Sequence, residues 1–104
     1  MTPSKIEREG GVPQTFTVEV TQTIEVELDP AKFDDTFMEE FRAGFFPFYT
    51  LEQHAEHIAQ LQARGIIDLD GFLSDLEFVE GYGPVRKMGL KARVTDSDTE
   101  VVLP

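Results

Sequence analysis

The feature that most constrains this fold is the stretch from Phe16 to Leu28, in which apolar and polar side chains alternate. Thr and Glu fill the odd positions, and aliphatic or aromatic side chains fill every even position except Gln22. Because successive side chains of a strand point to opposite sides of a sheet, the pattern predicts a long strand with one buried face and one acidic, exposed face. Gln22 interrupts the buried face and marks a bend, a bulge or a sheet edge.

A second alternating segment covers residues 88–94, and its outward side chains are mostly basic. We expect it to pair with the first strand, followed by a turn at Asp96–Thr99 and a short last strand at Glu100–Leu103. Opposite charges would then face each other across the sheet and stabilise it. The pairs would come from Glu19, Glu25 and Glu27 on one strand and Lys87, Lys91 and Arg93 on the other.

Two consecutive amphipathic helices are predicted between these strands. Asp29 and Pro30 form a helix start, and Asp34 or Asp35 offers an alternative start one turn later. The apolar stripe of the first helix is made by phenylalanines at four-residue spacing, which suits the centre of a core: Phe33, Phe37, Phe41 and Phe45.

The second helix is predicted to begin at a capping box, in which the side chains of Thr50 and Gln53 each accept a hydrogen bond from the other's backbone N–H. Gly65 ends this helix. Residues 66–80 suit either a helical turn or a short strand, and we favour a turn near 70–75 and a brief strand near 76–80. Residues 81–84 form a loop. The sequence therefore predicts an α+β fold, in which a three- or four-stranded antiparallel sheet carries two consecutive amphipathic helices on one face. Residues 1–13 are expected to be a flexible tail, and residues 14–104 a single domain.

Charge is the second informative feature, because 20 acidic residues face 9 basic ones and leave a net charge of -11. Residues 19–80 hold fifteen acids against three bases, so this segment alone carries -12. Such a field repels nucleic acid and phospholipid surfaces and attracts basic proteins, although acidic surfaces also simply keep proteins in solution. The absence of cysteine and of long apolar runs predicts a cytoplasmic protein that neither spans nor binds a membrane.

Three patterns superficially suggest chemistry, and each has a simpler reading. His54 and His57 lie on the second helix without the further ligands that a zinc site needs, so we interpret them as packed or surface histidines. The segment Asp68–Gly71 places its glycine too early for a calcium loop, and Gly81-Tyr82-Gly83 is not followed by the glycine and helix start of a phosphate loop. We therefore expect no cofactor, no metal and no enzymatic activity.

The candidate partner-binding residues are carboxylates on the helices and in the loop that follows, together with an aromatic pair. The carboxylates are either a contact patch for a basic partner or a solvated surface. The aromatic pair is either an interface anchor or the lid of the core. The full set is Asp34, Asp35, Glu39, Glu40, Glu52, Glu56, Asp68, Asp70, Phe48 and Tyr49.

Several phrases of the sequence resemble small acidic proteins carried by bacteriophages and prophages. Some proteins of that kind are anti-CRISPRs, which bind a CRISPR effector and often imitate nucleic acid with carboxylates. The resemblance implies a class of protein and assigns no residue a role. The phrases are Thr17-Val18-Glu19-Val20, Asp29-Pro30-Ala31-Lys32-Phe33, Phe37-Met38-Glu39-Glu40-Phe41-Arg42, His54-Ala55-Glu56-His57 and Glu80-Gly81-Tyr82-Gly83.

Two functions are therefore expected from different classes. The first is a non-enzymatic inhibitor of a bacterial defence complex, which occupies the complex's basic nucleic-acid-binding surface with its helix carboxylates and binds no nucleic acid itself. Its partner is a basic protein or nucleoprotein complex of the bacterial host. The alternative is a phage structural or assembly adaptor, a homo-oligomer that pairs through a sheet edge or through the aromatics of residues 46–49.

Overall fold

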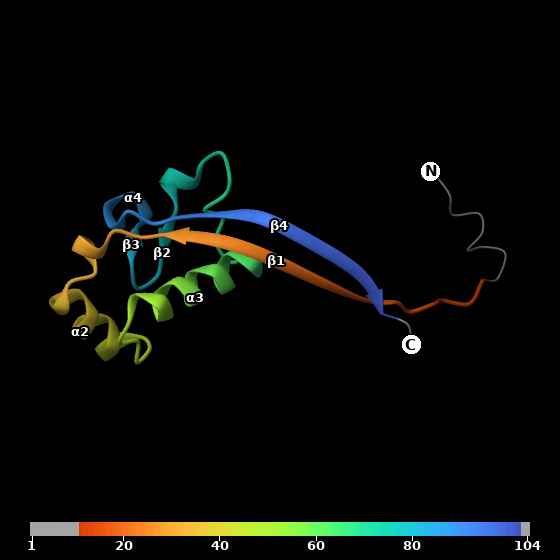
Figure 1. Cartoon of the computed structure of the whole chain (residues 1–104), viewed down its shortest axis with the longest axis horizontal. Coiled ribbons are helices and arrows are strands. Elements are labelled where there is room, and N and C mark those ends of the chain that lie inside the picture. Colours follow the sequence, from red (N-terminus) through yellow and green to blue (C-terminus); the bar gives the residue numbers. More distant parts are fainter. Residues whose placement is uncertain (1–10, 103–104) are drawn as a thin grey trace.

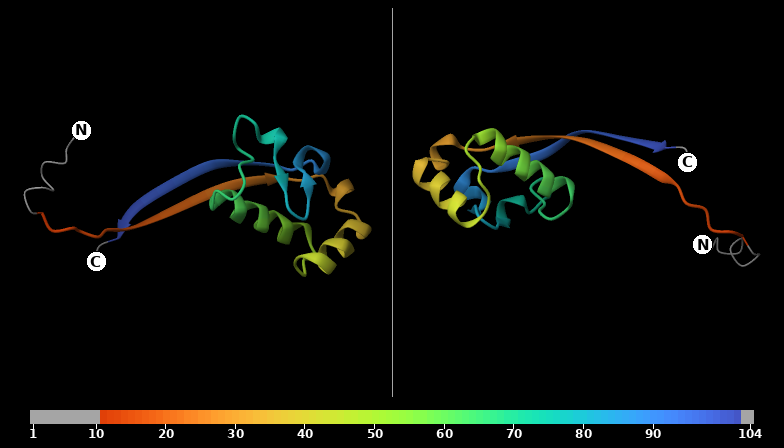
Figure 2. Two further views of the ribbon diagram at one scale, coloured as in Figure 1. Left: turned by 180° about the vertical axis from the view of Figure 1, so that it is seen from behind. Right: turned by 90° about the horizontal axis from the view of Figure 1, so that it is seen from below.

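A computed structural model describes residues 11–102, which form a compact head and a long two-stranded ribbon that projects from it (Figures 1 and 2). The molecule measures 63 × 29 × 25 Å, so the ribbon dominates its shape. In chain order, the elements are β1 (Thr17–Glu27), the 3₁₀ turn η1 (Pro30–Lys32), α2 (Asp35–Gly44), α3 (Leu51–Ala63), the 3₁₀ turn η2 (Ser74–Leu76), β2 (Phe78–Val79), β3 (Gly83–Pro84), α4 (Val85–Met88) and β4 (Lys91–Val102).

The ribbon pairs β1 with β4 in antiparallel register, from Thr17 opposite Val102 to Glu27 opposite Lys91. The predicted pairing of the two long strands is confirmed, but the predicted turn at Asp96–Thr99 is wrong, because this segment continues β4. Asp and Ser favour turns by local preference, yet here each residue from Asp96 to Thr99 has a cross-strand partner in β1. A register shift beside Ile24 takes up one extra residue of β4.

The fold class is α+β, as predicted, but the strands form two sheets of two strands each within residues 11–102. The prediction of one sheet with three or four strands is wrong for this part of the chain. β2 and β3 pair only with each other, through Phe78 opposite Pro84 and Val79 opposite Gly83. The carboxylate of Asp70 accepts a hydrogen bond from the backbone N–H of Val94 at 3.0 Å, so the loop after α3 contacts β4 at this position.

The helix starts follow the local signals closely. Asp29 caps the 3₁₀ turn η1 by accepting the Ala31 N–H at 2.9 Å, and Asp34 caps α2 by accepting the Phe37 N–H at 2.9 Å. The two alternative starts are therefore both used. The capping box at the start of α3 is confirmed, and Gly65 follows its end with a φ of +73°, which glycine adopts at little cost.

The core lies inside the head, where α3 packs beside the part of the ribbon nearest the head and α2 lies farther from the strands (Figure 1). The prediction that both helices lie on one face of the sheet therefore holds for α3 and is wrong for α2. The phenylalanine stripe contributes as predicted through Phe33 and Phe41, but Phe45 at its end is 44 % exposed. The other buried apolar residues come from every later part of the head: Met38, Ile58, Ile67, Leu69, Val79, Tyr82, Val85, Leu90 and Ala92.

Only the proximal half of the ribbon packs against this core. Ile24, Val26 and Leu28 are half-buried, whereas the side chains before them are exposed on both faces. The predicted buried face is therefore wrong for the distal half, where Phe16 is 67 % and Val20 61 % exposed. The physical reason is reach: α3 runs beside β1 near the head and ends before the distal part begins (Figures 1 and 2). We call Thr17–Thr23 and the facing residues 96–102 the distal ribbon.

The predicted tail, residues 1–13, lies mostly outside the described residues, and its described end, residues 11–13, is exposed and has no regular secondary structure. That residues 14–104 form a single domain stays a prediction.

Candidate functional site

The helix carboxylates proposed from the sequence are all exposed. Asp34, Asp35, Glu39 and Glu40 lie at the start and on the outer side of α2. Across residues 11–102 there is one ion pair, between Arg93 and Glu25, with 2.7 Å between Nη2 and Oε1. The acids of α2 are thus not neutralised by the cations of the described chain, although Asp34 also serves as the helix cap.

The remaining predicted acids are spread over two other parts of the chain. Glu52 and Glu56 are exposed on α3, and Asp68 and Asp70 are exposed in the loop that follows it. Asp70 is occupied by the backbone of β4 through its hydrogen bond to Val94. Asp70 therefore has a structural role, because its carboxylate fastens the loop after α3 to β4.

The aromatic pair divides into a core residue and a surface residue. Phe48 is half-buried and its ring stacks on Phe41 at 5.7 Å between centroids, which is the predicted lid of the core. Tyr49 is 69 % exposed, and the guanidinium of Arg42 lies 4.5 Å from its ring centroid. Arg42 also donates to the Phe48 carbonyl at 3.2 Å. Tyr49 is therefore held in place at the surface.

His54 is fully buried and belongs to the core. Its Nδ1 lies 2.7 Å from the Tyr82 hydroxyl, its Nε2 has no protein partner, and rings of Phe33, Phe37 and Phe41 surround it. Burial, with a smaller contribution from the charge of His57, lowers the pKa of His54 to about 4, so the imidazole is neutral at pH 7.

The neighbours of His54 are shifted for the same reason. Burial raises the pKa of the Tyr82 hydroxyl. Burial, followed by the charge of Arg64, lowers the pKa of His57, which is half-buried against the ring of Phe46 at 5.1 Å. No group of three or more histidines and acids that could hold a metal ion occurs within residues 11–102. A neutral His–Tyr pair enclosed by rings is suited to filling a core.

The acidic face of the distal ribbon is a candidate surface that was predicted only in part, because Asp96 and Asp98 were assigned to a turn. Glu19 lies directly opposite Glu100, and Thr21 and Thr23 lie opposite Asp98 and Asp96. Like charges that face each other across a sheet destabilise it. The expected neutralisation occurs only near the head, where Glu25 faces Arg93 and Glu27 faces Lys91. Lys87, the third expected cation, lies in α4.

The opposite face of the distal ribbon carries no charged side chain. It presents Val18 opposite Val101, Val20 opposite Thr99 and Gln22 opposite Ser97. The valines are 46 to 61 % exposed. A sequence signal for both faces existed in the spacing of Asp96, Asp98 and Glu100 at every second residue, which is the period of a strand. Turn-forming residue types within the same stretch hid that signal.

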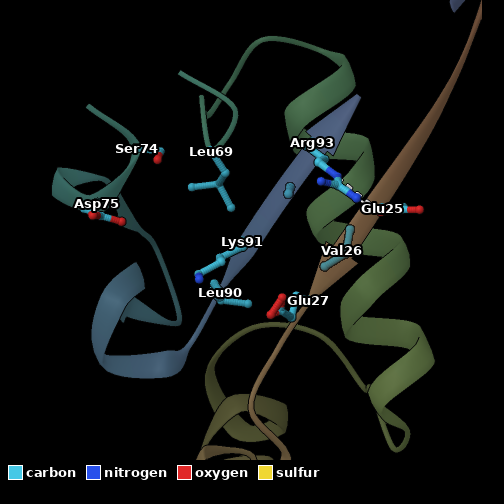
Figure 3. Close-up of a pocket in the computed structure, with 10 residues that line it drawn as sticks. Glu25, Val26, Glu27, Leu69, Ser74, Asp75, Leu90, Lys91 and Arg93 are labelled. Atoms are coloured by element: carbon cyan, nitrogen blue, oxygen red, sulfur yellow. Dashed lines mark hydrogen bonds and ion pairs between the residues drawn. The ribbon is translucent and has the colours of Figure 1, made fainter. Parts of the chain in front are cut away.

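A groove of about 680 Å³ lies between the proximal ribbon and the loop that follows α3 (Figure 3). The net charge of its lining is small, because three acidic and two basic side chains line it. The hydrogen bond and charge of Glu25 raise the pKa of Arg93, which strengthens its hold on the proton. The groove is lined by Glu25, Val26, Glu27, Leu69, Ser74, Asp75, Leu90, Lys91, Ala92 and Arg93.

No family model matches this chain, and neither does any curated protein or solved structure. Within residues 11–102, no helix has the length and apolar character needed to cross a membrane.

Proposed function

We propose that this chain is a non-enzymatic binding protein whose acidic surface holds a basic protein or nucleoprotein. The observation that supports this most is the acidic face of the distal ribbon, where four carboxylates line up and no cation of the described chain lies among their cross-strand partners. The four are Glu19, Asp96, Asp98 and Glu100.

The geometry of this face suits an extended basic surface. Side chains on one face of a strand repeat about every 7 Å, so Asp96, Asp98 and Glu100 form an evenly spaced row of anions. A row of anions is also what a nucleic-acid backbone offers to a positively charged channel. The arrangement lowers the stability of the free ribbon, and cations from a partner would relieve the repulsion.

The finer form of the proposal follows from the resemblance to small phage proteins. On that basis the partner is a defence complex of the bacterial host, and the chain inhibits it by occupying its nucleic-acid-binding surface. The exposed acids of α2 and α3 add to the negative field that steers such a partner.

Two variants with equal charge changes test which acidic surface is used. The ribbon variant carries E19Q, D96N, D98N and E100Q, and the helix variant carries D34N, D35N, E39Q and E40Q, where Asn keeps the helix cap. Each is immobilised beside the parent, exposed to bacterial lysate at about 0.05 and 0.5 M NaCl, and the bound proteins are identified by mass spectrometry.

We expect the parent to retain one or a few basic proteins at low salt and to release them at high salt, and the ribbon variant to lose at least tenfold of that binding. Loss confined to the helix variant would move the contact to α2. Equal binding by all three proteins would contradict an electrostatic mechanism altogether.

A further inference from the structure

The outer edge of β1 has no partner strand in the described part of the chain. β1 pairs with β4 along one edge, and α3 approaches it only near the head (Figures 1 and 2). From Thr17 to Thr23 every side chain of β1 is exposed. The backbone groups on that edge are therefore open to another strand.

A two-stranded ribbon that nothing covers is only marginally stable in water. The distal ribbon is in this situation, because neither its acidic face nor its uncharged face packs against the head. Independent stability of a sheet needs three or more strands with a hydrophobic face, or packing against a helix. The distal ribbon therefore gains most from an additional strand at one of its edges.

Charge distinguishes the two edges. β4 carries acids at three alternate positions, so two copies of β4 paired antiparallel about its centre would set acid against acid, for example Asp98 against Asp98 or Asp96 against Glu100. The distal part of β1 carries a single acid, Glu19, and its other side chains are threonines, valines and Gln22. The acidic side chains of β4 thus disfavour pairing with a second copy at the β4 edge, whereas the β1 edge remains open to pairing.

We propose that the free edge of β1 pairs with β1 of a second copy, antiparallel and with the two-fold axis at Val20, the midpoint of Thr17–Thr23. In this register Glu19 faces Thr21 of the second copy, Thr17 faces Thr23, and Val18 faces Gln22, so no like charges are directly opposed. The product is a four-stranded sheet in the order β4-β1-β1-β4. Two ribbons thereby form one sheet, and its two outer edges are the β4 edges, where the acidic side chains disfavour further pairing.

The pairing leaves each face of the sheet uniform. A two-fold axis perpendicular to the sheet keeps the uncharged faces on one side and the acidic faces on the other, so the carboxylates of both copies share one surface. Salt would screen their repulsion and strengthen the dimer, whereas it weakens binding to a basic partner. The inference does not depend on the proposed function, and the opposite salt responses separate the two.

Single cysteines test the pairing directly, because the natural chain has none. Val20→Cys would bring two thiols together on the axis, where facing Cβ atoms lie about 5 Å apart and a disulfide forms with little movement. Thr99→Cys is the matched control, since Thr99 faces Val20 on the same side of the ribbon. In the proposed sheet the two Thr99 positions are separated by three strand spacings, about 14 Å.

Both variants are oxidised under mild conditions at about 0.5 M NaCl and analysed on non-reducing gels, while the natural chain is examined by sedimentation over a concentration series. We expect a concentration-dependent dimer, and at least ten times more crosslinked dimer from V20C than from T99C. Crosslinking of T99C as strong as that of V20C would indicate pairing through β4 or stacking of the uncharged faces, and it would overturn the proposal. A chain that stays monomeric, or a dimer that V20C does not trap, would overturn it as well.

Discussion

His54 is the one polar side chain buried in the described core, and its ring is enclosed by aromatic neighbours with a hydrogen bond to Tyr82 at 2.7 Å. Its Nε2 has no protein partner, so the site tolerates a neutral imidazole and resists a charged one. The sequence indicated a packed or surface histidine on the second helix, but no pattern pointed to Tyr82, which lies in a loop far along the chain. Helical spacing predicts a face, whereas the partner on that face depends on tertiary packing.

The buried histidine predicts a pH dependence of stability. Unfolded His54 takes up a proton below about pH 6.5, whereas the folded protein resists protonation down to a pKa of about 4. The unfolded state therefore binds more protons in this window, and the free energy of unfolding falls as the pH drops from 6.5 towards 4, by an amount on the order of 3 kcal/mol.

Urea unfolding of the parent and of His54→Gln at pH 7, 5 and 4 measures this contribution, because the difference between them excludes effects of the other titrating groups. We expect the variant to be less stable at pH 7 and the gap to narrow as the pH falls. His57→Gln is the control, with a smaller change in the same direction, since His57 is only half-buried. A gap that stays constant with pH would show that His54 does not titrate as described.

The ribbon shows which element properties could be predicted from sequence and which could not. The first strand, its antiparallel pairing with the basic segment and the facing of acids by bases near the head were predicted, because alternation and charge are local patterns. The exposure of the distal half of the ribbon was not predicted. Alternation predicts that one face of a strand is apolar, but it does not predict whether the head is long enough to cover that face. The same limit applies to Asp96–Thr99, where pairing to β1 overrides turn preference.

Two identical substitutions on one face of the ribbon test the role of its charges. Glu25→Gln removes an acid that pairs with Arg93, and Glu100→Gln removes an acid that faces Glu19. We expect E25Q to lower the thermal midpoint and E100Q to raise it, with both shifts shrinking in 0.5 M NaCl. Calorimetry measures both, and shifts of the same sign would contradict the assignment of attraction to one position and repulsion to the other.

The whole molecule divides its stability unevenly between a packed head and an uncovered ribbon. The buried residues of the described core lie between Phe33 and Ala92, and only Ala92 belongs to a strand of the ribbon. The ribbon instead carries the two surfaces with no partner inside the described chain, one acidic and one edge of bare backbone. The acidic helices expected to be the site are only part of a wider negative surface, because the distal ribbon adds four carboxylates that no cation of the described residues faces.

Amide hydrogen exchange at two protein concentrations tests most directly whether the distal ribbon is an open surface completed by a second copy. At low concentration we expect amides of Thr17–Thr23 and residues 96–102 to exchange far faster than those of α3, as a marginal ribbon should. At high concentration the β1 amides should slow at least tenfold while the outer-edge amides of β4 remain fast. Protection that is the same at both concentrations, or that rises equally on the outer edge of β4, would contradict the pairing and the open ribbon from which it was inferred.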